Sequence, residues 1–493
     1  MSATGTGHTE RRLRVGIALR SNTQWMGGHH YVLSCVDALL ALPPVERPEV
    51  YLLWSTPSAR HDAKKLADQV DGHAHLAMAS RLGLDFVYPV KELSEAPSGV
   101  AWGGWIVDWQ QRHLPGMFTR SEHAMREMRY RVMAESAPII AHGSRQALED
   151  TRRWVPGAMA DLGVLHFRAT LETEILAGDP DDIRRRYALP PRFAVVSNQW
   201  FRHKNHGIVV EALRILRERG ITIPCVVTGR PEDHRWPDHG RSIQRRIEEL
   251  GLSSVIHLVG LVPRADQVQL IRAASVIIQP SLFEGWSTIV EEARSLGKTI
   301  VLSDIPVHRE QLPPGGNFFD PYDPESLADV LAEVWAADSD TSAVSREREA
   351  HAEHGQLQAD AGRALVDVAR RGIARYDAGR HDPARLLLRL AQEALLLGDD
   401  GDLARNFVGK AIRVWFTHHP WRFPGFAANL LEADAASRSW LASEVLPDMA
   451  QNSLRVRHMS WIDQAPVRQG WYPLLIEAVR DFAMLADAPG PNR

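Results

Sequence analysis

Cysteine is scarce in this chain of 493 residues, which has only Cys35 and Cys225. The two lie far apart in sequence, so a disulfide framework is not expected and a reducing compartment is the simplest environment. Long apolar runs are missing as well, since the first of them, Leu13 to Leu19, is broken by Arg14. We therefore expect neither a signal peptide nor a transmembrane helix. A cytoplasmic protein is favoured, with peripheral contact at the inner face of a membrane as the alternative.

An excess of charge of one sign is also absent, because the formal net charge is only -4. This balance does not suggest nucleic-acid binding. Metal-binding patterns are missing too. His203 and His206 are spaced i,i+3 without a carboxylate or cysteine nearby, and Asp338-Ser339-Asp340 lies in a late polar stretch rather than on a loop that ends a strand. We expect no metal site. The length and composition are typical of a globular protein of two or three domains.

Apolar, β-branched runs alternate with helical patterns in two separate series. The first series predicts strands near residues 13–19, 50–54, 100–107 and 138–141, with helices near 29–42, 60–70 and 121–137. The second predicts strands near 193–197, 224–229, 255–260, 276–280 and 299–303, with helices near 206–218, 238–250 and 265–273. Such alternation is typical of doubly wound parallel sheets.

We therefore predict an α/β protein with two doubly wound, Rossmann-like domains, residues 11–175 and 190–340, that face each other across a cleft. A helical region at 341–380 would cross back to the first domain. Residues 381–493 read as an α-helical extension, which offers a surface for a protein partner or for self-association.

Two positions at strand ends in the first domain are candidate ligand contacts. Gly27 and Gly28 precede a helix, where glycines let the backbone approach an anion, although such pairs also serve as plain turns. Asp108 stands where a strand ends, which is where ligands bind in these sheets; the alternative is a cap of the next turn. The arginine-rich segment 112–131 favours a solvated helix face, with an acceptor or membrane-surface contact as the alternative.

The stretch from Pro280 to Ala293 carries the strongest functional signal. It follows a buried strand and places Glu284 on a loop. Thr288-Ile289-Val290-Glu291 matches a capping box that starts a helix, and Gly297 is placed to stop it. Glu292 then lies one turn into the helix, on the face of its mouth. The N–H groups of the first helical turn make this opening a natural phosphate site.

A second polar loop, residues 198–206, opens the second domain at a strand-to-helix turn. Its Arg202 and Lys204 could neutralise a diphosphate, or they could be a pair of solvated surface charges. The loop alone does not decide between the two.

Together these motifs resemble the retaining glycosyltransferases of family 4, the glycosyl transferases group 1, which have the two-domain GT-B fold. The resemblance covers residues 15–329. It rests on Glu284 to Glu292 as the family's Glu-x7-Glu element, on residues 303–310 as the segment that follows it, and on the offsets of residues 197–206 and 255–260.

The resemblance implies a role for each matching residue. Glu284 would contact hydroxyls of the donor sugar, and Glu292 would hold the ribose hydroxyls. Lys204 matches the family's phosphate-binding lysine, but the arginine usually found five residues earlier is Gln199 here, so Arg202 is the candidate for the second charge. N–H groups of Ser287, Thr288 and Ile289 would contact sugar or phosphate oxygens, Gly27 and Gly28 the phosphates, and Leu261 and Val262 the base. The family's catalytic His-Asp pair at the end of a first-domain strand is incomplete here: Asp108 fits it well, and His113 is a weaker candidate for the histidine.

The implied activity is retaining, metal-independent transfer of a hexosyl unit. The donor would be a nucleotide sugar such as a UDP-, GDP- or ADP-hexose, and the acceptor a hydroxyl of a glycan, a glycolipid or other lipid-linked carbohydrate, or a small molecule. No permanently bound cofactor is expected. Two alternatives remain: a nucleotide-sugar epimerase on the same fold, and a non-catalytic sugar-nucleotide-binding scaffold protein.

Overall fold

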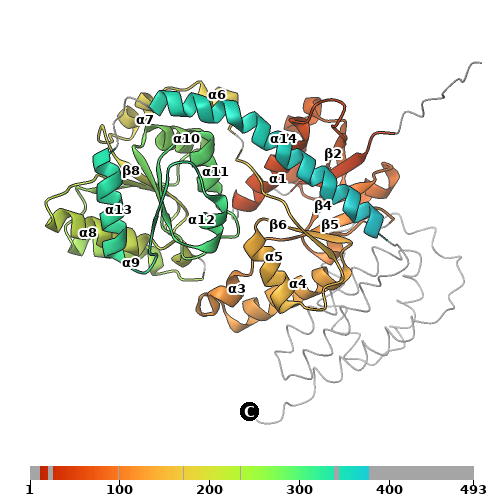
Figure 1. Cartoon of the computed structure of the whole chain (residues 1–493), viewed down its shortest axis with the longest axis horizontal. Coiled ribbons are helices and arrows are strands. Elements are labelled where there is room, and N and C mark those ends of the chain that lie inside the picture. Colours follow the sequence, from red (N-terminus) through yellow and green to blue (C-terminus); the bar gives the residue numbers. More distant parts are fainter. Residues whose placement is uncertain are drawn as a thin grey trace, which may run out of the picture.

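The computed structural model describes residues 11–376 except 20–25, 98, 170, 234 and 338–342. This part of the chain forms two parallel sheets of seven and six strands with helices packed against them (Figure 1). The predicted class, two doubly wound α/β domains, is therefore confirmed. The expected extension at 381–493 lies outside the described residues.

The first sheet has the strand order β3-β2-β1-β4-β5-β6-β7. Its strands are β1 (Arg14–Ala18), β2 (Glu49–Trp54), β3 (Gly72–His75), β4 (Phe86–Val90), β5 (Ala101–Ile106), β6 (Ile139–His142) and β7 (Asp161–Val164). The helices between them are α1 (Met26–Leu40), α2 (Pro57–Lys65), α3 (Gln110–His113), α4 (Arg120–Ser136) and α5 (Arg145–Trp154), with short 3-10 turns η1 (Ala67–Gln69), η2 (Leu76–Arg81), η3 (Leu93–Glu95) and η4 (Pro115–Met117). Strands β3, β4 and β7 were not among the expected strands.

The second sheet has the order β10-β9-β8-β11-β12-β13. Its strands are β8 (Ala194–Ser197), β9 (Cys225–Thr228), β10 (Ile256–Gly260), β11 (Val276–Gln279), β12 (Ile300–Ser303) and β13 (Gly316–Phe319). The helices are α6 (Thr173–Leu176), α7 (Pro180–Arg186), α8 (His206–Glu218), α9 (His239–Glu249), α10 (Arg264–Ala273), α11 (Thr288–Ser295), α12 (Pro306–Gln311) and α13 (Pro324–Ala337), with the 3-10 turn η5 (Arg202–Lys204). The five predicted strands are found here, and β13 is additional.

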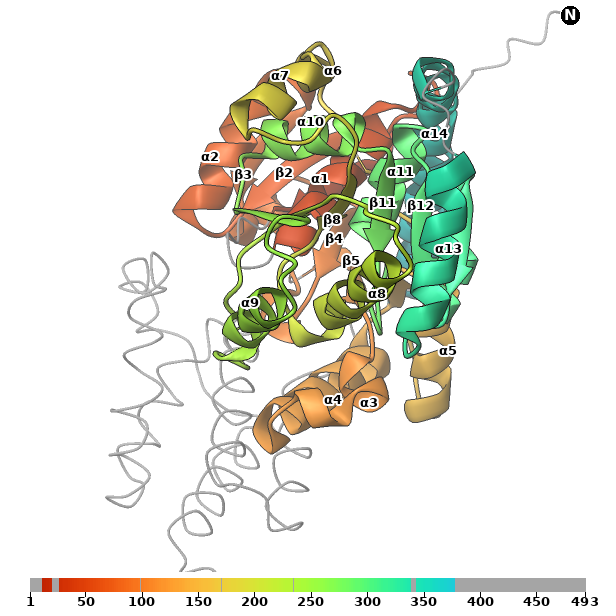
Figure 2. The ribbon, with the colours of Figure 1, turned by 90° about the vertical axis from the view of Figure 1, so that its left-hand side faces the viewer.

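Central strands are buried on both faces because they are continuous apolar runs. All four residues of β8, β11 and β12 are buried, as expected for a parallel sheet covered by helices. Figure 2, which looks onto the second domain, shows α8 and α9 on one face of its sheet and α10 and α11 on the other. Both cysteines are buried and free.

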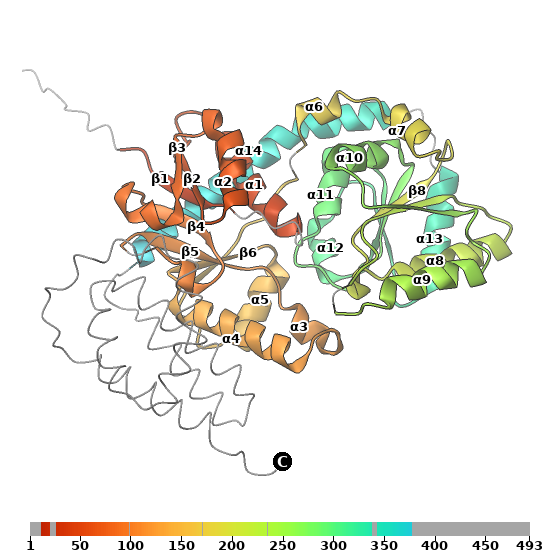
Figure 3. The same ribbon diagram turned by 180° about the vertical axis from the view of Figure 1, so that it is seen from behind.

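The 33-residue helix α14 (Ala343–Arg375) carries the chain from the second domain back to the first. It packs on α11 in the second domain and on α1 and strands β4 to β7 in the first. Figures 1 and 3 show it running along one side of both domains. For residues 341–380 the sequence predicts a helical region that crosses back to the first domain. Among the described helices, none is long and apolar enough to span a membrane.

Candidate active site

The two domains meet at the loop that follows β11. Glu284 on this loop is buried, and its Oε1 lies 2.6 Å from Nζ of Lys204, at the end of η5. Burial would raise the pKa of Glu284, but Lys204, with His203 and His308 adding to its effect, holds that pKa below its ordinary value. Glu284 is therefore an ionised acceptor with one cation beside it. Both residues are candidates from the sequence, and the structure brings them together from positions 80 residues apart.

Gln279, the last residue of β11, holds the Glu284 loop through side-chain hydrogen bonds. Its Nε2 donates to Glu284 Oε1 at 2.8 Å, and also contacts the hydroxyls of Ser281 and Ser287 at 3.1 and 3.0 Å. Its Oε1 accepts from Nδ2 of Asn198 at 2.6 Å, on the loop after β8. Gln279 is fully buried, so this network has a fixed geometry in a low-dielectric site.

The start of α11 corrects the capping box expected at Thr288. Ser287 is the N-cap, and its N–H donates to Oε1 of Gln311 at 3.0 Å. Glu291 does not reach back to the cap, because its carboxylate accepts from Arg168 at 2.8 Å and from Gln311 at 2.9 Å. The helix ends before Gly297, as expected.

Thr288 and Ile289 open α11 beside the Glu284 loop. Within the described residues, no side chain accepts a hydrogen bond from either N–H group. These two N–H groups could donate to an anion, and their role as donor contacts stays a prediction.

Glu292 is almost fully buried on α11 and forms an ion pair with Arg264, the first residue of α10, at 2.5 Å. Burial, followed by the nearby Arg264, lowers the pKa of His30 in α1 to about 4. His30 at the start of α1 in the first domain thus lies near Arg264 in the second. Gly28, in this first turn, is buried, whereas Gly27 is exposed.

The loop between β10 and α10 runs into Arg264. Leu261 on this loop is 58% exposed, whereas Val262 packs partly against the core of the second domain. Leu261 therefore adds an exposed apolar side chain to the loop that ends at Arg264.

Asp108 lies at the domain contact, directly after β5. Its Oδ1 accepts from the N–H of Gln110 at 3.0 Å, the capping role given above as an alternative, and from Nη1 of Arg126 at 3.2 Å. Arg126 on α4 is therefore not part of a solvated helix face, which the arginine-rich pattern had favoured. His113 is held by Asp150, with Nε2 2.7 Å from Oδ2, and its ring lies near Phe283 with the centroids 5.0 Å apart.

Gly285 allows a close approach of the two domains. A Cβ atom at this position would lie 2.8 Å from the carbonyl oxygen of Val107 and 3.2 Å from Cβ of Asp108. Any side chain here would push the Glu284 loop away from the end of β5.

Trp286, the next residue, is inserted into the first domain. It is 9% exposed and belongs to the same hydrophobic cluster as Tyr31 and Phe167. Its Nε1 donates to the carbonyl oxygen of Phe167 at 3.2 Å. Glu310 of α12 makes a polar contact nearby, since its carboxylate accepts from the N–H of Arg145 at the start of α5 at 2.8 Å. The cleft is therefore closed on one side by a tight, partly apolar contact.

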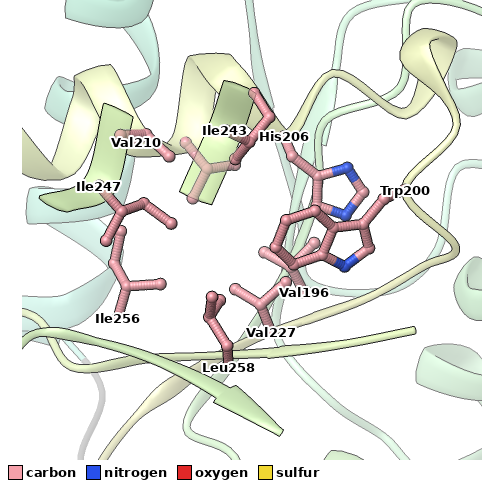
Figure 4. Close-up of a pocket in the computed structure, with 10 residues that line it drawn as sticks. Val196, Trp200, His206, Val210, Val227, Ile243, Ile247, Ile256 and Leu258 are labelled. Carbon is pink, nitrogen blue, oxygen red and sulfur yellow. The ribbon is translucent and has the colours of Figure 1, made fainter. Parts of the chain in front are cut away.

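The loop that carries Lys204 packs on a small apolar cavity under α8 and α9 (Figure 4). Trp200 and His206 stack above it with centroids 5.2 Å apart, and Trp200 Nε1 donates to the carbonyl oxygen of Thr228 at 3.1 Å. The space available to water centres is about 10 Å³, which is roughly one water molecule. The cavity therefore supports the loop and is too small for a substrate. It is lined by Val196, Trp200, His206, Val209, Val210, Val227, Ile243, Ile247, Ile256 and Leu258.

Three other polar residues of this loop, Arg202, His203 and His206, make no hydrogen bond to Glu284 within the described residues. The guanidinium of Arg202 stacks on Trp236 at 4.4 Å, and its role as the second phosphate charge stays a prediction. His203 and His206 are buried, and burial lowers the pKa of each to about 3. In the described part of the chain, no three His, Cys, Asp or Glu side chains gather closely enough to hold a metal ion.

Several residues of the site were not found from the sequence. Gln279, Gln311 and Arg264 are polar residues in elements whose pattern is otherwise apolar or amphipathic, and nothing in that pattern marks them. Trp286 lies inside the Glu284–Glu292 motif, but its partners come from the other domain. Only contacts between distant segments reveal these four.

Residues 180–350 match the family model of glycosyl transferases group 1. Within the curated proteins, D-inositol 3-phosphate glycosyltransferase of Corynebacterium urealyticum is 24% identical over 178 residues, which cover 35% of this chain and 42% of that protein. The match thus spans less than half of that relative's length.

Solved structures show the fold of the whole described region. A glycosyltransferase from Rickettsia africae has a TM-score of 0.53 with 12% identity, covering 73% of this chain and 99% of that one. HepE of Anabaena in complex with UDP has a TM-score of 0.52 with 14% identity, covering 72% and 99%. Sucrose-phosphate synthase of Thermosynechococcus elongatus has a TM-score of 0.51 with 15% identity, covering 74% and 96%. The architecture is therefore the GT-B arrangement expected from the sequence.

Proposed function

We propose that the protein is a retaining glycosyltransferase of family 4 that transfers a hexosyl unit from a nucleotide sugar to an acceptor hydroxyl. The observation that carries this proposal is the Lys204–Glu284 pair, 2.6 Å apart, beside the N-terminal turn of α11. A cation and N–H donors suit a diphosphate, and a buried carboxylate suits sugar hydroxyls. All three lie within the segment that matches the group 1 family model.

The donor would lie along α11 with its sugar at Glu284 and its nucleoside at Glu292. The ribose hydroxyls would donate hydrogen bonds to Glu292 in place of Arg264. The base would rest on Leu261 and Val262. Solved structures of HepE contain UDP or UDP and glucose, which supports a nucleotide-sugar donor for a chain of the same fold.

Catalysis requires stabilisation of a leaving diphosphate and of an oxocarbenium-like sugar. Lys204 and the N–H groups of Thr288 and Ile289 would stabilise the diphosphate, with Gly27 and Gly28 approaching from the first domain and Arg202 as a second cation. Glu284 would hold and orient the sugar. These groups provide positive charge without a metal ion, and we propose metal-independent transfer for this reason. Asp108 would face the acceptor from the end of β5.

The first test is a thermal-shift screen with UDP-, GDP- and ADP-hexoses, because a ligand that binds only the folded state raises the melting temperature. With the donor found, Lys204→Ala and Glu284→Gln should each lower turnover by roughly 100-fold or more, whereas Lys65→Ala, in the exposed last turn of α2, should have no effect. Glu292→Gln should weaken donor binding with little change in turnover, since the ribose is remote from the reacting bond.

The same assay separates the alternatives. Unchanged transfer in both the Lys204 and Glu284 variants would contradict the proposal. An altered sugar nucleotide formed without any acceptor would indicate an epimerase. Donor binding without turnover across a broad acceptor panel would indicate a sugar-nucleotide-binding protein.

A further inference from the structure

His308 lies in the first turn of α12, and its side chain is completely buried. A continuous series of hydrogen bonds joins it to Glu284. Nδ1 of His308 is 2.9 Å from the carbonyl oxygen of Ser303, and the Ser303 hydroxyl donates to the carbonyl oxygen of Ser281 at 2.5 Å. The Ser281 hydroxyl accepts from Gln279, which also donates to Glu284 at 2.8 Å. His308 is thus fixed to the same buried network that holds Glu284.

The hydrogen-bond partner of Nδ1 determines the tautomer of His308. A carbonyl oxygen can only accept, so Nδ1 carries the ring hydrogen that is donated to Ser303. Burial lowers the pKa of His308 to about 4, although the neighbouring Glu284 opposes this effect. At neutral pH the ring therefore has one hydrogen, on Nδ1, and Nε2 is an acceptor. This Nε2 is buried and has no hydrogen-bond partner within the described residues.

The orientation of α12 places this acceptor beside the Glu284 loop. Gln311, three residues after His308, lies on the same face of the helix. Its side chain bonds to both the N–H and the carbonyl oxygen of Ser287, each at 3.0 Å, at the start of α11. Nδ1 of His308 is held at the end of β12, so Nε2, across the ring, points away from that strand. Besides burial, the pKa of His308 responds to the charges of Glu284 and Lys204, which therefore lie near the ring.

We propose that Nε2 of His308 accepts a hydrogen bond from a hydroxyl group of the donor sugar, which makes His308 a specificity-determining residue. This rests on the proposed function, in which the sugar lies at Glu284. A buried acceptor without a donor is unfavourable, and a sugar hydroxyl would supply the missing hydrogen. An ionised diphosphate oxygen would not, because it has no hydrogen to donate. The sugar would thus meet two acceptors, a carboxylate and a neutral imidazole, each of which requires a hydroxyl group at its own ring position.

The test compares the affinity of a hexose donor with the affinities of its deoxy analogues, by calorimetry on the full chain. The probes are UDP-glucose, GDP-mannose and ADP-glucose, and the one that binds is compared with the analogues that each lack one hydroxyl group of the hexose. In the wild type, loss of the hydroxyl that faces His308 should weaken binding by roughly 10-fold, the worth of one neutral hydrogen bond. In His308→Asn this analogue should bind as well as the parent, and the other affinity ratios should not change.

Two substitutions distinguish the roles of the two ring nitrogens. In His308→Asn the side-chain amide can take the place of Nδ1 and keep the bond to Ser303, but no atom replaces Nε2. In His308→Gln an amide oxygen lies near the former Nε2, and the bond to Ser303 is lost. His308→Gln should therefore retain part of the hydroxyl discrimination that His308→Asn loses. If His308 only supports the end of β12, the order will be reversed, with His308→Asn like the wild type, and the inference is wrong.

His354 on α14 provides the matched control. It is also buried, its Nδ1 contacts the Ser295 hydroxyl at 3.1 Å, and its Nε2 has no partner among the described residues either. His354→Asn should leave every affinity ratio unchanged, because this ring contacts the end of α11 rather than its start. Ratios that are the same in the wild type and in His308→Asn would overturn the inference while donor binding still stands. Absent binding of all three nucleotide sugars would contradict the proposed function itself.

Discussion

Trp286 stacks on His166 across the domain contact, with ring centroids 4.2 Å apart and ring planes 9° from parallel. Because Trp286 is only two residues from Glu284, the docking of this ring also sets the position of the carboxylate beside Lys204. The contact that closes the domains is thus part of the chain segment that would hold the donor sugar.

Removing this ring should therefore affect both stability and turnover. Trp286→Ala deletes a buried side chain, and we expect a loss of about 3 to 5 kcal/mol in the free energy of unfolding. Turnover should fall by about 100-fold, since the loop would shift by the order of 1 Å. Trp335→Ala is the control, because Trp335 packs under Arg192 far from the cleft. Equal turnover in the two variants would show that the ring only contributes packing. Urea unfolding and initial rates measure the two effects.

The Lys204–Glu284 pair predicts a reversal of pH dependence. In the wild type the folded-state pKa of Glu284 is below its ordinary 4.5, so its contribution to stability is present above that value and is lost as the pH falls through the folded pKa. In Lys204→Met burial dominates and places the pKa above 4.5, so the contribution is present below that value and is lost as the pH rises.

Between about pH 4 and 7, the wild type should thus keep or gain stability with rising pH, whereas Lys204→Met should lose it, by about 3 to 5 kcal/mol at neutral pH. The measurement is urea unfolding at several pH values. Adding Glu284→Gln to each background should remove the difference in slope. Parallel curves for the wild type and Lys204→Met would contradict the coupling.

Gln279 should act as a positioning residue for Glu284. Gln279→Met keeps the volume but removes donors to Glu284, Ser281 and Ser287. We expect kcat to fall by roughly 10- to 100-fold with a smaller change in the KM of the donor. Gln269→Met, in which another buried glutamine loses its bond to the Ile175 carbonyl, is the matched control. A similar loss of kcat in both would indicate general destabilisation.

Gly285→Ala tests the close approach of the domains. The new methyl group would meet the Val107 carbonyl and Asp108, so we expect the Glu284 loop to shift and kcat/KM to fall by roughly 10-fold or more. Gly355→Ala, on α14, is the control because its Cβ would meet no atom within 4 Å. Steady-state kinetics with small-angle scattering would show whether the loss accompanies a wider cleft. Unchanged kinetics would mean that the cleft opens before substrate binds.

Much of the fold could be predicted because the central strands are apolar runs that must be buried on both faces. Three of the four missed strands lack that signal, whereas β4, Phe-Val-Tyr-Pro-Val, is central and fully buried and was missed although it is apolar. β3 is Gly-His-Ala-His and β13 is Gly-Asn-Phe-Phe, and both lie at sheet edges, as does β7. An edge strand is half covered, so its sequence need not be continuously apolar.

Part of the site could also be predicted from the sequence. Glu284, Glu292 and Lys204 follow local patterns of strand, loop and helix, and the structure places Glu284 against Lys204. The partner of Glu292 could not be predicted, since Arg264 is 28 residues away and begins another helix. Nor could the pairing of Arg126 with Asp108, which depends on how α4 packs beside β5. Such contacts are set by tertiary packing, which periodicity does not encode.

The contacts of helix α14 with the two domains indicate which parts of the molecule would move together when substrate enters. At about 1.5 Å per residue its 33 residues span about 50 Å. It is clamped to the first domain, where a Cβ on Gly362 would come within 2.2 Å of the Ala38 carbonyl, and where Arg371 bonds to Asp161 at 2.8 Å. Its early turns hold the second domain through Arg272 and Glu347, at 2.8 Å. An opening motion would therefore have to bend the chain between His354, whose ring contacts Ser295 of the second domain, and Gly362, with the later turns of α14 moving together with the first domain.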